Sequence, residues 1–230
     1  EQYPAMLSQG IREGLKQRGQ VPPMVADTVG YVVSSSFSAD KIEQQIITDL
    51  QAQLTDKQLQ AVSEWYQTPI ARKISNAEIA ASAPEAWPQI QASAPELNRK
   101  YKGTPKAEMF DRFDRAARAT ESAVDTTIAV QLGLATAMSA LSSESMHYEQ
   151  LERRIENQRG MLRGVVGQQV YDSYLYTYDK ISAQELALYL DFLESPAGKQ
   201  FSQVVTSSIQ QAIMEPVESI GRQISRFMAP

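Results

Sequence analysis

A helix-and-proline unit that occurs twice constrains the fold of this chain more than any other feature of its sequence. One copy spans residues 54–75 and the other spans residues 181–202. Each copy has a Ser or Thr with Gln or Glu three residues later, and then a second Ser or Thr followed directly by proline. The first pattern is a capping box, which begins a helix, and the second ends one helix and begins the next. Two copies in register therefore predict helices that arose by duplication.

The two copies match in chemistry more than in identity. Thr55 and Ser182 are the expected caps, and Trp65 and Phe192 are large aromatic residues on the helix before the proline. Because the fixed spacing turns the chain at the proline, we expect each ring to be buried beside its own break. The residues of the motif are Leu59, Trp65, Thr68 and Pro69 in the first copy, and Leu186, Phe192, Ser195, Pro196 and Gly198 in the second.

The second copy, Phe192 to Lys199, resembles the bacterial family catalogued as domain of unknown function 2059. The pattern of that family is a capped helix, an aromatic residue and then Ser/Thr-Pro-x-Gly/Ala-Arg/Lys. The first copy resembles the family less closely than the second, with Thr68 in place of Ser and Ala71 in place of Gly. The resemblance implies an all-helical fold in proteins that Gram-negative bacteria export. It implies no chemistry, because it carries no activity over to these residues.

The composition is that of a globular protein and excludes several classes of function. Of the 230 residues, 43% are apolar and 21% are charged, and acidic residues outnumber basic ones by 27 to 22. This balance argues against a nucleic-acid binder, whose phosphate contacts need a basic face. The chain has no Cys and one His, which excludes disulfides, thiolate sites and multi-histidine metal sites. We therefore expect no metal and no cofactor.

Signals for helices dominate the whole chain, so we predict an all-α, multi-helix bundle of two related helical halves. The halves are residues 1–103, with the first motif copy, and residues 104–230, with the second, and we expect them to form one compact unit. Three prolines in Ala81–Leu97 predict a non-helical connector. The charge-free run Thr126–Ser143 is too polar for a membrane span and predicts a buried central helix.

Two short motifs that suggest chemistry have simpler explanations. Glu144 and His147 have the spacing of one di-iron ligand pair, but the chain has no second His to complete such a site. Ser38 and Lys41 have the Ser-x-x-Lys spacing of penicillin-recognising enzymes, but the companion motifs are absent, and Ser38 fits better as a helix cap. We single out no catalytic residue and predict that the protein is not an enzyme.

Tyr171, Tyr174 and Tyr178 lie at helical spacing and place three rings on one face. Such a face is a candidate surface for a ligand, such as a sugar or a peptide, or for a partner. The alternative, which we favour, is a half-buried core face whose hydroxyls reach water. In the C-terminal helix, residues 213–227 have an apolar stripe that fits the protein's own core or, as the alternative, an anionic membrane surface.

Acid-before-base pairs in residues 108–118 predict an exposed, salt-bridged helix face. The pairs are Glu108 with Arg112, Asp111 with Arg115 and Asp114 with Arg118. Exposed pairs contribute only a few tenths of a kcal/mol, so we expect Ala at Asp111 or Asp114 to leave stability almost unchanged.

The start at Glu1 fits a mature chain from which a signal peptide was removed, which predicts a periplasmic or secreted protein. A cytosolic protein is the alternative. The predicted function is a non-catalytic interaction or accessory module of the cell envelope, with an unidentified envelope protein as partner and with neither nucleic acid nor a transmembrane segment. A carrier of a small or apolar ligand in a cavity between the halves is the second hypothesis, and a hydrolase of unrecognised type is the third.

Overall fold

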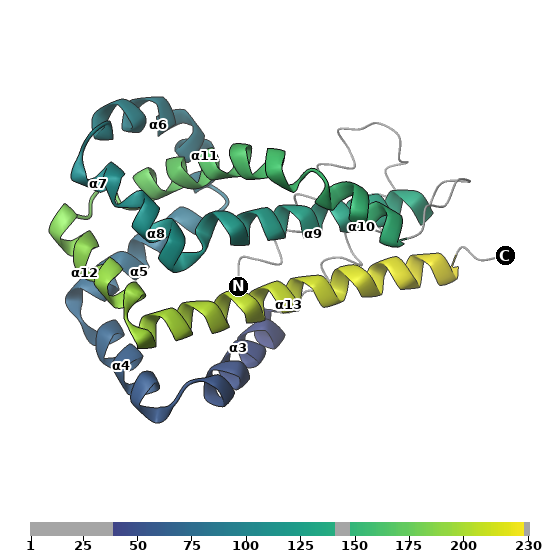
Figure 1. The fold of residues 1–230 in the computed structure, drawn as a ribbon, viewed down its shortest axis with the longest axis horizontal. Helices are drawn as coiled ribbons and strands as arrows, with labels where there is room; N and C mark the ends of the chain where they lie inside the picture. The colour runs from purple at the N-terminus through teal and green to yellow at the C-terminus, as the bar shows by residue number, and fades with distance from the viewer. Residues whose placement is uncertain (1–38, 141–147, 228–230) are drawn as a thin grey trace. The chain divides into compact units, whose positions relative to one another are not determined.

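The computed structural model describes residues 39–140 and 148–227, and all the regular secondary structure in these ranges is helical (Figure 1). The prediction of an all-α, multi-helix fold is confirmed. None of the described helices combines the length and the apolar character that a membrane crossing requires. The helices are α3 (Ala39–Gln53), α4 (Asp56–Gln67), α5 (Pro69–Ser82), α6 (Ala86–Tyr101), α7 (Pro105–Glu108), α8 (Phe110–Ala117), α9 (Ala119–Ala140), α10 (Tyr148–Glu156), α11 (Arg159–Thr177), α12 (Ala183–Glu194) and α13 (Pro196–Phe227).

Both predicted capping boxes are present, at the starts of α4 and α12. The Thr55 hydroxyl accepts a hydrogen bond from the backbone N–H of Gln58 at 3.3 Å, and the Gln58 side chain accepts the N–H of Thr55 at 3.0 Å. Ser182 and Glu185 make the same reciprocal bonds at 3.2 and 2.8 Å. These bonds satisfy N–H groups that a helix start leaves unpaired.

The two Ser/Thr-Pro steps also behave as the sequence predicts. Pro69 and Pro196 begin α5 and α13. The hydroxyl of Thr68 accepts the backbone N–H of Ala71 at 3.1 Å, and the hydroxyl of Ser195 accepts that of Gly198 at 3.0 Å. Each step therefore ends one helix and caps the next, as the motif requires.

The prediction of a non-helical connector at residues 81–97 is wrong, because α5 continues to Ser82 and α6 begins at Ala86. Pro88 is the third residue of α6, where the backbone N–H would have no helical partner in any case. Pro95 lies inside α6 and removes one helical hydrogen bond. The helix nevertheless continues past it and buries Leu97 and Tyr101 in the core, so that packing outweighs local propensity.

The prediction of an exposed, salt-bridged helix face over residues 108–118 is wrong in two respects. Helix α8 ends at Ala117, and Arg118 takes the left-handed conformation with φ of 52° and ψ of 35°. Arg112 reaches α12 instead of a neighbour on its own helix, and Asp114 accepts the backbone N–H of Thr120 at 2.7 Å. Asp114 therefore caps α9, which no i, i+4 pattern indicates.

Replacing Asp114 by Ala should destabilise the fold by about 1 kcal/mol, because the first turn of α9 loses its cap. Asp111→Ala is the matched control, since Asp111 is exposed and lies one turn earlier on the same helix. Urea denaturation of both variants measures the difference in the free energy of unfolding. Equal stability of the two variants would contradict the capping role.

The structure divides into two compact units. The first to be described consists of residues 46–123 and 163–207, and it contains both motif copies. Within it, α12 packs against α5, α7 and α8, and α5 also packs against α4 and α6. Its core is built mainly from aliphatic and tyrosine side chains of α5, α6, α11 and α12. Both units contain residues from either side of residue 103, so they do not coincide with the two sequence halves.

The other unit consists of residues 1–45, 124–162 and 208–230 and is described in part. It contains most of α9, all of α10 and the beginning of α11. Ile128, Ala129 and Leu132 are buried on α9, in agreement with the prediction of a buried helix for the charge-free run; residues 141–143 of that run lie outside the described residues. Arg159 joins α11 to α9 through Asp125 at 2.7 Å. The side chains of residues 213–227 lie outside those described, so the predicted apolar stripe of α13 stays a prediction.

Candidate functional site

A carboxylate lies between two tyrosine hydroxyls within the unit that holds both motif copies. Glu78 of α5 accepts hydrogen bonds from the hydroxyl of Tyr178 at 2.7 Å and from that of Tyr189 at 2.8 Å. Burial raises the pKa of Glu78, and the two hydrogen bonds oppose that rise in part. Burial also raises the pKa of both tyrosines well above the ordinary value. The group joins α5 to α12 and to the turn after α11, so its bonds are structural.

Two of the three tyrosines of the predicted ligand face lie in the core. Tyr174 and Tyr178 are each 2% exposed, whereas Tyr171 is half-buried. The hydroxyl of Tyr174 donates to the backbone carbonyl of Lys106 at 2.7 Å, and its ring packs 5.3 Å from that of Phe110. The hydroxyls of Tyr174 and Tyr178 therefore bond protein acceptors instead of reaching water. The structure places these rings in a core face, with Tyr171 at its edge.

Lys106 is a buried cation that no sequence pattern indicates. It is 7% exposed, and its Nζ donates to the backbone carbonyls of Tyr178 at 2.8 Å and Asp179 at 3.1 Å. The ammonium also lies 4.6 Å from the ring centre of Tyr101. Burial lowers the pKa of Lys106. These two carbonyls follow the C-terminal end of α11, the negative end of the helix dipole, where a cation is stabilising. Lys106 comes from α7 and therefore caps the end of α11.

The two motif copies meet in this unit. The rings of Trp65 and Phe192 stack with centroids 4.8 Å apart and planes 8° from parallel. Lys73 of the first copy donates to Glu185 of the second at 2.8 Å. That bond, together with those from the cap residue Ser182, lowers the pKa of Glu185 to about 2. Trp65 and Phe192 are half-buried, so the expectation that each is buried beside its own proline is wrong: they pack on each other.

The remaining motif residues have structural surroundings. Leu186 is fully buried, and Leu59 packs in a smaller cluster that contains Phe192 and Phe201. Gly198 is buried, and its Cα faces the backbone carbonyl of Phe192. These motif residues therefore build the helix corners.

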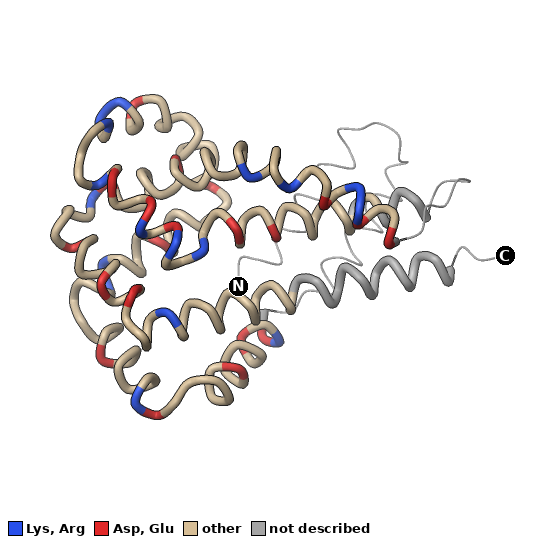
Figure 2. The backbone as a smooth tube through the Cα atoms, in the orientation of Figure 1, with Lys and Arg blue, Asp and Glu red and all other residues tan. Residues whose placement is uncertain are grey.

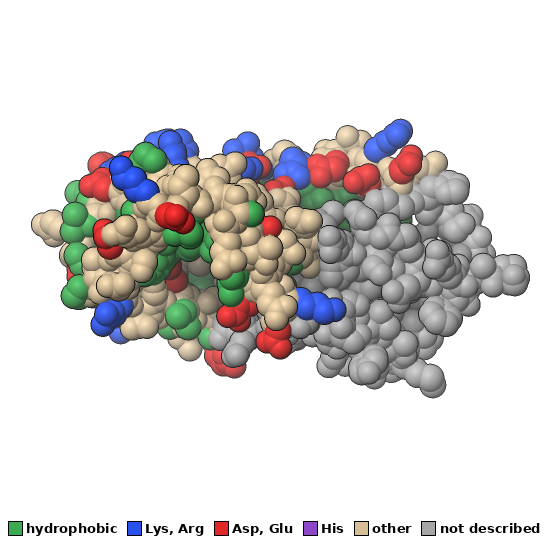
Figure 3. Space-filling model, turned by 90° about the horizontal axis from the view of Figure 1, so that it is seen from below, with side chains coloured by type: hydrophobic (Ala, Val, Ile, Leu, Met, Phe, Trp, Pro, Cys, Tyr) green, Lys and Arg blue, Asp and Glu red, His purple; other side chains and the backbone are tan. Residues whose placement is uncertain are grey.

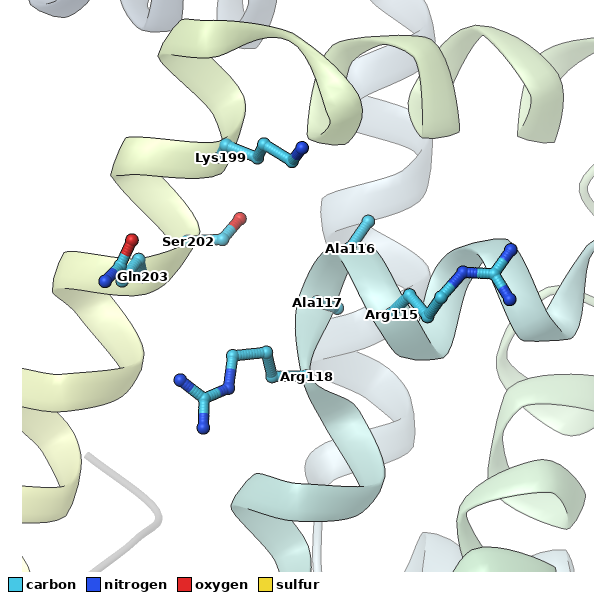
Figure 4. Close-up of a pocket in the computed structure, with 7 residues that line it drawn as sticks. All are labelled: Arg115, Ala116, Ala117, Arg118, Lys199, Ser202 and Gln203. Atoms are coloured by element: carbon cyan, nitrogen blue, oxygen red, sulfur yellow. The ribbon is translucent and has the colours of Figure 1, made fainter.

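A recess lined by positive charge lies between the end of α8 and the first turns of α13 (Figure 4). Its volume is about 230 Å³. We call it the basic recess. It is lined by Arg115, Arg118, Lys199, Ser202 and Gln203, together with the two alanines between the arginines.

An acidic residue close to the basic recess is already neutralised. Both oxygens of Glu194 accept hydrogen bonds from the guanidinium of Arg112, at 3.0 and 2.6 Å. The same guanidinium reaches Asp191 at 3.1 Å. Arg112 lowers the pKa of Glu194, with smaller contributions from Arg115 and Lys199. Elsewhere the two signs of charge are mixed along the described helices (Figure 2) and over the described part of one face (Figure 3).

The two sequence motifs that suggest catalysis lie wholly or partly outside the described residues. Glu144 and His147 are in one such segment and Ser38 is in another, so only Lys41 of the Ser-x-x-Lys pair is described. Among the residues whose side chains the structure describes, no three acidic or histidine side chains are grouped so that they could hold a metal ion.

Residues 40–100 match the model of a family described as an uncharacterised protein conserved in bacteria, domain of unknown function 2059. The chain is therefore similar to this family over α3 to α6. The matched segment contains the first motif copy. The second copy, whose sequence resembles this family more closely, lies outside the match. No curated protein and no solved structure matches the chain.

Proposed function

We propose that this chain is a non-catalytic, exported protein that acts as an interaction or accessory module of the bacterial cell envelope. The observation that carries the proposal is the exposure of two large apolar side chains, one on each side of the α5–α6 turn, within the segment that matches the bacterial family. There Ile79 is 63% exposed and Trp87 is 50% exposed. A Trp side chain has a large apolar ring and a polar N–H, which makes it frequent in protein interfaces.

The buried ionisable groups of the core support a non-catalytic role. Glu78 and Lys106 both bond to groups of the protein that hold helices together. The lining of the basic recess comes from residues 115–118 and 199–203, all in the second sequence half, so it is not the cavity between the halves that the carrier hypothesis requires. Its lining contains Ser202 but no His or carboxylate that would act as a base for this hydroxyl. Neither alternative function gains support from these groups.

Photo-crosslinking in the living bacterium tests the proposal. A benzophenone amino acid at Trp87 should give one dominant adduct with an envelope protein, and the adduct should appear in the periplasmic fraction. The same amino acid at Gln60, an exposed position on α4, is the control. An equal set of adducts at both positions, or recovery of the protein only from the cytosol, would overturn the proposal.

A further inference from the structure

We propose that the basic recess binds a phosphate group, either as a free ion or at the end of a larger molecule. The chain carries a formal net charge of −5, yet three of its cations line this one recess between two helices. Such a gathering of like charge is unfavourable unless an anion compensates it. This inference is independent of the proposed envelope partner.

The three cations have no acidic partner within the part of the chain that the structure describes. Arg115, Arg118 and Lys199 form no ion pair with a described carboxylate. Glu194 lies close enough to be influenced by two of them, but both of its oxygens are bonded to Arg112. The positive charge of the recess is therefore available to a ligand.

The side chains around the recess supply donors from two directions. In Figure 4, Lys199 and the hydroxyl of Ser202 extend from α13 towards α8, and Arg118 extends from the end of α8 towards α13. The guanidinium of Arg115 points away from α13 and contributes charge at longer range. A guanidinium offers paired N–H donors and an ammonium offers a compact charge, which is the combination that phosphate oxygens accept.

The backbone adds to the positive field at this place. Lys199 lies in the first turn of α13, at the positive end of the dipole of that helix, so a cation there is unfavourable without an anion. Arg118 directly precedes Ala119, the first residue of α9, but the Asp114 carboxylate already caps the start of α9 through the N–H of Thr120, so the uncompensated helix end here is that of α13. A phosphate, which carries between one and two negative charges at neutral pH, compensates such a field better than a singly charged carboxylate.

The size of the recess limits the ligand to a small anion or an end group. Its volume of about 230 Å³ is below the range of roughly 300–1,000 Å³ that is typical of pockets for drug-sized ligands. The side chains of Arg115, Arg118, Lys199 and Gln203 are exposed, so a phosphate can enter directly from solvent.

Titration calorimetry of the full chain with inorganic phosphate, at constant ionic strength, tests the site. The double variant Arg118→Asn/Lys199→Gln should weaken phosphate binding at least about tenfold. Asn is chosen at position 118 because it tolerates the left-handed backbone found there. Ser202→Ala, which keeps all the charges, should weaken binding by a smaller factor. Lys57→Gln removes one exposed charge from α4 and should leave binding unchanged.

Phosphatidylcholine vesicles with and without phosphatidic acid distinguish a lipid headgroup from the free ion. Binding to the phosphatidic acid vesicles that the double variant loses would identify the headgroup as the source, and binding of inorganic phosphate alone would identify the free ion. The proposal is overturned if the folded wild type binds neither probe at millimolar phosphate, or if the double variant binds as tightly as the wild type. Circular dichroism of each variant verifies that it is folded.

Discussion

Gly198→Ala is expected to destabilise the protein by about 3 kcal/mol, although Ala favours helices more than Gly does. A Cβ at this position would fall on the backbone carbonyl oxygen of Phe192 and lie 2.8 Å from its carbonyl carbon. The carbonyl belongs to the helix backbone just before Ser195 and Pro196, so it cannot rotate away as a side chain would. The corner between α12 and α13 would have to open.

Gly164→Ala is the matched control for this change. Gly164 is an exposed helical glycine of α11, and an added Cβ would meet no atom within 4 Å. We expect Ala there to stabilise the protein by roughly 0.5–1 kcal/mol. Guanidinium denaturation, followed by circular dichroism, measures both changes. Stabilisation by both variants would show that the corner has room for a side chain at Gly198.

Glu78→Ala should also destabilise the protein by about 3 kcal/mol. The change leaves the hydroxyls of Tyr178 and Tyr189 without the carboxylate that accepts both, and each unsatisfied buried hydroxyl destabilises by about 1–3 kcal/mol. Combining Glu78→Ala with Phe at both tyrosines removes the unpaired hydroxyls, so it should recover part of the loss. A triple variant no more stable than Glu78→Ala would contradict this account.

The pH dependence of stability tests the same carboxyl group by a second route. The pKa of Glu78 is raised above its ordinary value of 4.5, so the folded state binds this proton more tightly than the unfolded state does. The resulting stabilisation is complete below pH 4.5 and is lost as the pH rises through the raised value. Glu78→Gln cannot titrate, so the wild type should lose stability relative to it over that interval. If the free energies of unfolding of the wild type and Glu78→Gln changed in parallel with pH, the raised pKa of Glu78 would be contradicted.

The sequence predicted the helices and their caps because those interactions are local. Thr55 with Gln58, and Ser182 with Glu185, are three residues apart, so their spacing alone defines the contact. Pro95 shows the limit of this reasoning, since the packing of Leu97 and Tyr101 keeps a helix where the local rule ends it.

The polar groups of the core could not be found in this way. Glu78 is 100 residues from Tyr178 and 111 residues from Tyr189, and no spacing rule connects positions so far apart. The charged residues at 108–118 are compatible both with ion pairs along one exposed helix and with an ion pair to another helix. Only the position of α12 decides that Arg112 bonds Glu194. The basic recess likewise depends on α8 and α13 lying together.

The stacked rings of Trp65 and Phe192 have a consequence for how the chain can be divided. The segment that matches the bacterial family ends at residue 100, but the surface that covers Trp65 and Ile74 comes from α12, in the second half of the chain. A fragment cut at the edges of the match would expose this aromatic and aliphatic surface to water, and it would aggregate or stay unfolded. Sequence similarity and autonomous folding therefore have different limits in this protein, and an expression fragment that keeps the first copy must also keep the second.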